Sequence, residues 1–170
     1  VLEERRTIEI LAADGLTPTL MSWTTQLAPA PGHDAVELTG AHYYGLGIRL
    51  LQSLDRVGRF IYASGEAGEI VRGEERLTPS AWCAYTVPAD DARVTIALFS
   101  HPSDARHPPR MFTMPQPFAY AAATLNLWKD PLVIEAGRPL TLVYGVALWD
   151  GAADRDEIER VYQKWIVARG

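Results

Sequence analysis

Short runs of apolar and β-branched residues, separated by Gly, Pro and Asp turn signals, recur along almost the whole chain. Such runs predict strands, because β-branched and aromatic side chains suit a pleated, half-buried surface. The predicted strands cover residues 5–12, 17–27, 36–39, 43–51, 60–62, 81–87, 93–100, 111–114, 119–128, 132–134 and 140–148. Many short strands with a turn roughly every ten residues are typical of an antiparallel β-sandwich.

Residues 154–167 follow a helical pattern instead. Asp154 is a good N-cap, and Glu157 stands three residues later, where a capping-box partner is expected. The apolar stripe that follows at helical spacing consists of Ile158, Val161, Tyr162 and Trp165. We therefore predict an all-β fold, an antiparallel β-sandwich with one C-terminal α-helix, and we expect the helix to close one end of the sheets.

Residues 52–79 have the least regular pattern, with four glycines and many charged side chains. We interpret them as a long excursion that contains one short strand at residues 60–62. A loop of this length inside a domain is usually functional or partly disordered. Whether it forms a lid over a site stays open at this point.

The chain of 170 residues fits one domain with a sizeable core, so we predict a single β-sandwich domain over residues 1–170. Val1 opens directly into a predicted strand without an initiator Met, and we expect that an upstream segment was removed or omitted. The single cysteine, Cys83, lies in an apolar and aromatic run, and we interpret it as a buried structural thiol.

A formal net charge of −5 argues against a nucleic-acid surface, because neutralising phosphates needs clustered Lys and Arg. The chain also has no uninterrupted apolar stretch of about 18 residues, which a membrane-spanning helix needs. We therefore predict a soluble protein with neither nucleic acid nor membrane as a partner. Its compartment stays open, with the cytoplasm favoured.

The densest polar segment, residues 101–110, follows a strongly apolar strand and is stiffened by prolines. His101, Asp104 and His107 are of metal-ligand types, but their spacing matches no recognised zinc signature. We predict neither a metal site nor another cofactor here. The alternative is a tight turn in which Asp104 accepts backbone N–H bonds and Arg106 braces the sheet.

The same loop is better suited to contact a sugar, because polar groups can bind hydroxyls while aromatic rings cover an apolar ring face. Arg106, His107 and Arg110 supply polar groups. Trp82, and also Tyr43, Tyr44 or Trp128, can supply the aromatic platform, although a single aromatic residue in a sandwich is more often core.

His42 and Arg49 flank the glycine-rich segment 45–47, where a ligand or another backbone can approach closely. If His42 faces the same side as His101, the two histidines, with Glu66 or Glu69, can perform general acid–base chemistry. The alternative is a hydrogen-bonded surface histidine. We therefore treat His42, His101 and His107 as candidate catalytic residues, and Arg49, Trp82, Arg106 and Arg110 as candidate substrate-binding residues.

Three segments resemble a known family. Gly45-Leu-Gly-Ile-Arg49, then Trp82-Cys-Ala-Tyr85, then the segment from Ala97 to Pro108 resemble the C-terminal half of PmoA-like proteins, soluble bacterial proteins labelled "methane oxygenase". The match runs from about Leu38 to the end of the chain, which implies that the domain is the C-terminal part of a longer one. This sequence departs from the family loop at Asp104, where an amide is expected, and at His107.

The resemblance implies a distant relation to sugar-active β-sandwiches of the galactose-mutarotase type. Methane oxidation itself we set aside, because that activity belongs to a membrane protein. We therefore expect a carbohydrate-associated protein, an acid–base enzyme that acts on a sugar or oxidised sugar. The alternatives are a non-catalytic sugar-binding module and a structural module that pairs with a second copy or a missing N-terminal half.

Overall fold

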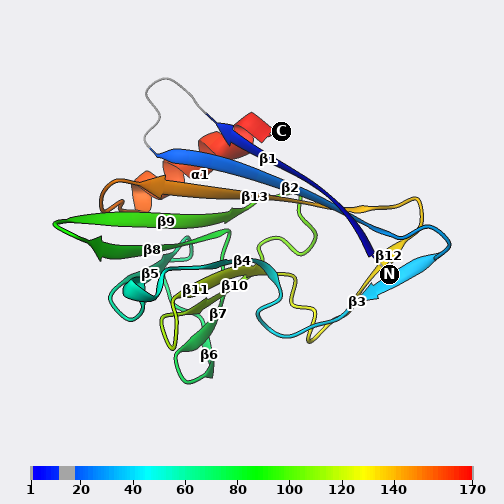
Figure 1. Ribbon diagram of the computed structural model, residues 1–170, viewed down its shortest axis with the longest axis horizontal. Coiled ribbons are helices and arrows are strands. Elements are labelled where there is room, and N and C mark those ends of the chain that lie inside the picture. Colours follow the sequence, from blue (N-terminus) through cyan, green and yellow to red (C-terminus); the bar gives the residue numbers. More distant parts are fainter. Residues whose placement is uncertain (1, 12–17, 170) are drawn as a thin grey trace.

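Two antiparallel sheets face each other in the computed structural model, which describes residues 2–11 and 18–169 (Figure 1). The larger sheet has six strands, and neighbouring strands in it are antiparallel. In sheet order these strands are β1 (Leu2–Leu11), β2 (Thr19–Pro29), β13 (Leu140–Trp149), β9 (Ala92–Ser100), β8 (Trp82–Ala89) and β5 (Arg59–Tyr62). The predicted all-β sandwich is therefore confirmed.

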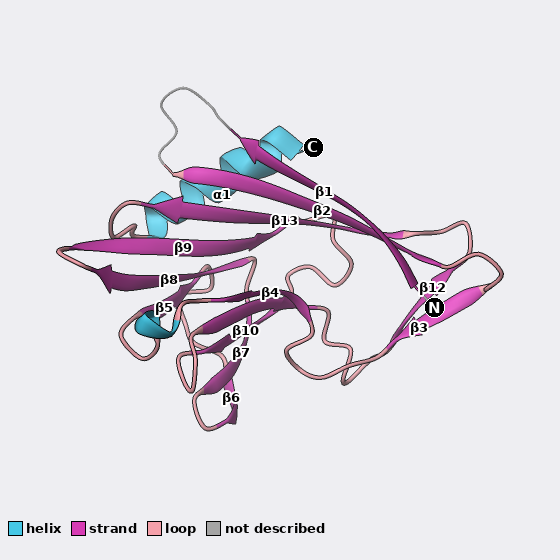
Figure 2. Ribbon diagram, in the orientation of Figure 1, coloured by secondary structure: helices cyan, strands magenta, loops and turns pink. Residues whose placement is uncertain are grey.

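The smaller sheet has five strands, and a two-stranded ribbon extends beyond it (Figure 2). In order, the five strands are β4 (Gly45–Arg49), β11 (Tyr120–Thr124), β10 (Arg110–Met114), β7 (Glu75–Pro79) and β6 (Glu69–Arg72). The ribbon pairs β12 (Leu132–Glu135) with β3 (Ala35–Leu38). The predicted turn at residues 14–15 lies outside the described residues.

The main core fills the space between the two sheets. Leu98 and Leu142 of the large sheet pack there against Met111 and Ala123 of the small sheet. The hydroxyl of Tyr62 crosses the core to Thr113, with 2.7 Å between the two oxygens. Cys83 is buried in this core, and burial raises the pKa of its thiol to about 12, so it is a structural thiol as predicted.

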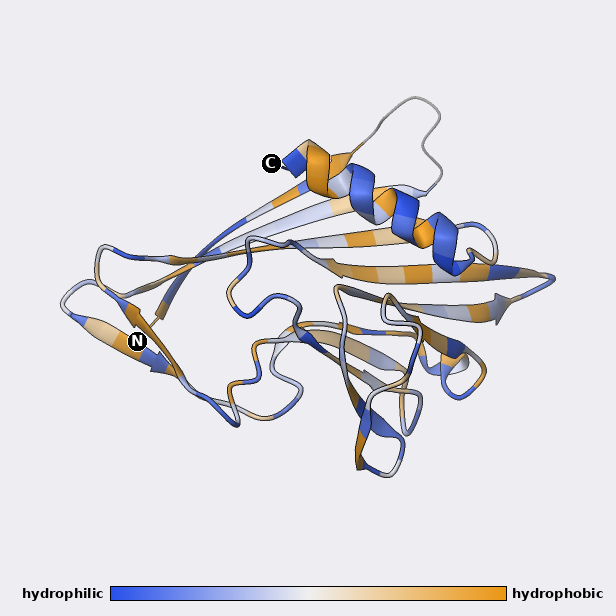
Figure 3. Cartoon of the chain, turned by 180° about the vertical axis from the view of Figure 1, so that it is seen from behind, coloured by the Kyte–Doolittle hydropathy of each residue, from blue (hydrophilic) through white to orange (hydrophobic). Residues whose placement is uncertain are grey.

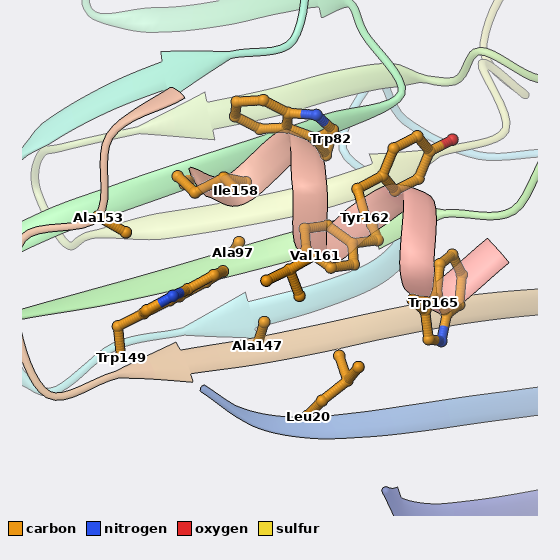
Figure 4. Close-up of a cluster of buried hydrophobic side chains, with 12 residues drawn as sticks. Leu20, Trp82, Ala97, Ala147, Trp149, Ala153, Ile158, Val161, Tyr162 and Trp165 are labelled. Carbon is orange, nitrogen blue, oxygen red and sulfur yellow. The ribbon is translucent and has the colours of Figure 1, made fainter. Parts of the chain in front are cut away.

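The C-terminal helix, α1 (Arg155–Arg169), packs on the outer face of the large sheet, which corrects the expectation that it closes one end of the sheets (Figure 3). Its predicted apolar stripe is buried against small residues, Ala97 of β9 and Ala147 of β13 (Figure 4). The predicted N-cap is confirmed, because Asp154 Oδ1 accepts the backbone N–H of Glu157 at 2.8 Å. No helix among the described residues is long and apolar enough to cross a membrane.

The predicted excursion over residues 52–79 is wrong. The segment contains a 3₁₀ turn, η1 (Gln52–Leu54), and the three strands β5, β6 and β7. β6 is an edge strand whose residues are all exposed, so its charged side chains face water and hide the strand pattern. β7 lies inside the small sheet between β6 and β10, so this part of the segment is no lid.

Candidate functional site

The glycine-rich strand β4 lies at the edge of the small sheet. Gly45, Gly47 and Arg49 share the outer face, which points away from the core, because the alternate residues Leu46 and Ile48 pack into the core. A Cβ atom on Gly47 would collide with the phenol ring of Tyr120, and one on Gly45 with the carbonyl of Ala123. The glycines therefore allow close contacts within the protein, and the phenol of Tyr120 packs directly against Gly47.

An aromatic hollow of about 440 Å³ opens on this outer face, on the side of the sandwich opposite α1. We call it the small-sheet hollow. The residues that line it are Tyr43, Arg49, Arg72, Glu75, Phe112, Met114, Pro117, Phe118 and Tyr120. Phe112 and Met114 are contributed by β10 and Tyr120 by β11, where strand alternation directs these side chains to the same face. The hollow thus combines apolar walls with a few charged groups, the usual composition of a ligand site.

A charged cluster bounds one end of the hollow. The Glu75 carboxylate accepts two hydrogen bonds from Arg72, from Nη2 at 2.6 Å and from Nε at 3.2 Å. Its second oxygen lies 3.2 Å from Nε2 of His42. Burial alone would raise the pKa of Glu75, but the bonds from Arg72 and His42 outweigh it and the pKa is lowered. Glu75 is therefore an anionic, well-positioned acceptor at neutral pH.

Arg49 bounds the opposite end of the hollow. Its guanidinium carbon lies 4.1 Å from the centre of the Phe118 ring, a cation–π contact. Phe118 also packs edge-on against Tyr120, with ring centres 6.3 Å apart. Arg49 therefore places a cation, oriented by an aromatic ring, at the wall of the hollow.

The lowered pKa of Glu75 predicts how stability responds to acid. A carboxyl whose pKa lies below the ordinary 4.5 when folded stabilises the native state above that value and loses this contribution as pH falls through the folded pKa. We expect the stability advantage of wild type over Glu75→Gln to be constant near neutral pH and to shrink below about pH 4.5. Urea unfolding of both proteins over this range measures it, and an advantage that grows in acid would contradict the lowered pKa.

The predicted catalytic histidines do not converge. His42 lies beside Phe112 on the outer face of the small sheet, with ring centres 5.4 Å apart. His101 lies beside Trp165 of α1, on the outer face of the large sheet, with ring centres 5.5 Å apart. Strand parity is the reason, because the residue after Ser100 points to the same side of β9 as Phe99, which faces the helix. His42 and His101 therefore face different sides, so the condition for acid–base chemistry by this pair is not met.

The loop at residues 101–110 is organised by Asp104, which is buried. Its carboxylate accepts bonds from Ser100 Oγ and from the backbone N–H groups of His101 and Val143, at 2.7–3.0 Å. Burial raises the pKa of Asp104 despite these donors, and it lowers the pKa of His107, whose Nδ1 lies 3.4 Å from Ser100 Oγ. The alternative interpretation of a tight turn fits this network.

The remaining predicted binding residues lie outside the hollow. Arg106 is bonded to the carbonyls of residues 125, 130 and 131 and to the Asp130 carboxylate, so it holds the loop to the segment between β11 and β12 and does not brace the sheet itself. Arg110 pairs with Glu69 at 3.8 Å. Trp82 is fully buried, and its indole N–H donates to Glu159 at 2.7 Å, so it is a core residue rather than a sugar platform. Among the described residues no three His, Cys, Asp or Glu side chains are placed to hold a metal ion.

Sequence reasoning thus identified His42, Arg49 and Tyr43 at this site and missed the others. Phe112, Met114 and Tyr120 had a usable signal, since they alternate with core residues along β10 and β11. Glu75 had none, because residues 75–79 carry charges that suggested a loop. The completed site offers a carboxylate, two guanidiniums and several aromatic rings around one hollow.

Comparison with known proteins gives one result. Searches of curated proteins and of solved structures found no match to this chain. The model of a family of unknown function, DUF6807, matches residues 1–163, which is nearly the whole chain. The chain therefore belongs to the DUF6807 family.

Proposed function

We propose that this chain binds a saccharide in the small-sheet hollow. The observation that carries the proposal is the hollow itself, in which aromatic rings stand between Glu75 with Arg72 at one end and Arg49 at the other. A pyranose ring has one largely apolar face and a rim of hydroxyl groups. Aromatic rings cover such a face, while a carboxylate and guanidiniums bind adjacent hydroxyls.

The polar end of the hollow suits hydroxyl recognition. Glu75 is anionic and accepts hydrogen bonds, and Arg72 donates them. His42 stands behind Glu75 and does not line the hollow, so it orients the carboxylate instead of contacting the ligand. A sugar diol presents a donor and an acceptor side by side, which matches this pair. The resemblance to PmoA-like proteins, which implies a distant relation to sugar-active sandwiches, supports the same proposal.

Acid–base catalysis on the bound sugar is the second candidate function. The contact of His42 with Glu75 favours it, because an oriented carboxylate at the wall of a pocket can accept a proton from a hydroxyl. The bonds from Arg72 and His42 lower the pKa of Glu75, however, which makes it a weak base. Binding without turnover is therefore the function that the geometry supports best.

Removing the aromatic wall should weaken binding. Phe118→Ala is expected to reduce saccharide affinity by about tenfold, because an apolar contact of this size contributes roughly 1–2 kcal/mol. Isothermal titration calorimetry against a panel of neutral and acidic mono- and oligosaccharides measures this. Trp23→Ala is the matched control, since Trp23 also carries a stacked arginine, Arg6 at 4.7 Å, but lines a different cleft between the sheets.

The outcomes distinguish the two candidate functions from each other and from the case in which no saccharide binds in the hollow. If Phe118→Ala and Trp23→Ala lost saccharide affinity equally, the ligand would bind elsewhere and the proposal would be contradicted. Two-dimensional exchange NMR on the bound sugar detects interconversion of its anomers. Protein-dependent exchange that is lost in Glu75→Gln, with affinity kept, would establish the catalytic candidate instead.

A further inference from the structure

We infer that the saccharide carries a carboxylate, as a hexuronic or aldonic acid does, and that Arg49 binds it. This inference rests on the proposed function and names the class of its ligand. It follows from three observations: the unused hydrogen-bond donors of Arg49, the contact of its guanidinium with Phe118, and the charge around the hollow.

Arg49 makes no side-chain hydrogen bond and has no carboxylate within 4.0 Å among the residues that the structure describes. Three other arginines of or beside the small sheet have carboxylate partners, whereas Arg56 and Arg59, which have none among the described residues, do not line the hollow. Arg72 pairs with Glu75 at 2.6 Å, Arg110 with Glu69 at 3.8 Å, and Arg106 with Asp130 at 3.1 Å. Arg49 is therefore a cation at the wall of a hollow with its donors unused.

The ring of Phe118 restrains the guanidinium, whose central carbon lies 4.1 Å over the ring centre. A guanidinium is planar and carries its N–H groups along its edge. That edge is a fork of parallel donors, which matches the two oxygens of a carboxylate. The stacking also reduces the side-chain entropy that binding would otherwise cost, because the guanidinium is held before the ligand arrives.

The charge balance of the hollow favours an anionic ligand. The charged side chains of its lining are two arginines and one glutamate, and Arg72 already neutralises Glu75. The charge of Arg49 is left uncompensated at the opposite end. A ligand that places one negative charge beside Arg49 and its hydroxyls beside Glu75 would match both ends. A single guanidinium suits the single charge of a carboxylate better than a phosphate dianion.

The test compares acidic sugars with neutral analogues of the same shape. Probes are D-galacturonate and D-glucuronate, their methyl esters, the parent hexoses, glucose 6-phosphate, and short oligomers of galacturonate and alginate. We expect wild type to bind the acids about tenfold more tightly than the esters, as one charge-assisted bidentate contact contributes about that factor. The preference should decrease as salt rises.

Arg49→Ala should abolish the preference for the acids over their methyl esters, whereas Arg49→Lys should keep part of it. Arg6→Ala is the matched control, because Arg6 stacks on Trp23 in the same way but is already paired with Glu4 at 2.7 Å. Tighter binding of glucose 6-phosphate than of the uronates would overturn the carboxylate assignment. So would equal binding of acids and esters, although the proposed function would then stand. Failure of every sugar to bind would overturn both.

Discussion

Replacing Trp165 with alanine is expected to lower the free energy of unfolding by about 3–5 kcal/mol, as for other fully buried aromatic residues. Trp165 lies on the face of α1 that packs against the sheet, and it has no solvent exposure. It packs against Phe99 of β9, with ring centres 5.8 Å apart, and its indole N–H donates to Ser22 of β2 at 3.3 Å. Its removal leaves a cavity that two rigid sheet strands cannot fill. Urea denaturation followed by circular dichroism measures the loss.

Val167 provides the matched control on the same helix. It is 82% exposed, so Val167→Ala should change stability by no more than about 0.5 kcal/mol. Similar losses in both variants would contradict the packing of α1 on the sheet. A small loss in both would mean that the helix contributes little to the fold.

The sequence pattern of α1 predicts the helix itself but not the surface that it covers. Its stripe and its cap at Asp154 could be read from sequence, because both depend on residues within one turn or two of each other. The surface that it covers could not be read in the same way. Yet a signal existed in the uninterrupted apolar run at residues 96–99, since a strand covered on both faces has no need to alternate.

The small-sheet hollow was harder to predict because its parts come from distant segments. Glu75 and His42 are 33 residues apart, and only the pairing of β7 with β10 and of β10 with β11 brings them to one face. β7 itself was not predicted, since its first two residues, Glu75 and Arg76, are charged. Missing one interior strand therefore concealed the carboxylate around which the polar end is built.

The polar loop at residues 101–110 suggested a site for the opposite reason. Its residues are close in sequence, and their clustering suggested chemistry. In the structure Arg106 donates hydrogen bonds to backbone carbonyls within residues 125–131. Asp104 accepts one from the backbone N–H of Val143. A cluster of polar side chains between prolines can thus serve to hold a loop against a sheet. Arg49, isolated in its strand, lines the small-sheet hollow and has donors left for a ligand.

Asp104→Ala is accordingly expected to lower the free energy of unfolding by about 2–4 kcal/mol. The substitution removes the acceptor of three buried or half-buried donors, and each unsatisfied donor carries a cost of about 1–3 kcal/mol, reduced where water can enter. Asp104→Asn should be only slightly more stable than Asp104→Ala. Its amide group must face either the N–H of His101 or that of Val143, because each carboxylate oxygen accepts from one of them.

The comparison with Asp91→Ala makes this result decisive for the role of the loop. Asp91 is exposed in the turn between β8 and β9, so its loss should leave stability almost unchanged. If Asp104→Ala were instead as stable as wild type but lost affinity for a sugar or a metal ion, the loop would be a ligand site and its bonds to the sheet incidental. The expected pattern is the reverse: a large loss of stability and, in the folded fraction, unchanged saccharide binding in a hollow on the opposite face of the sandwich.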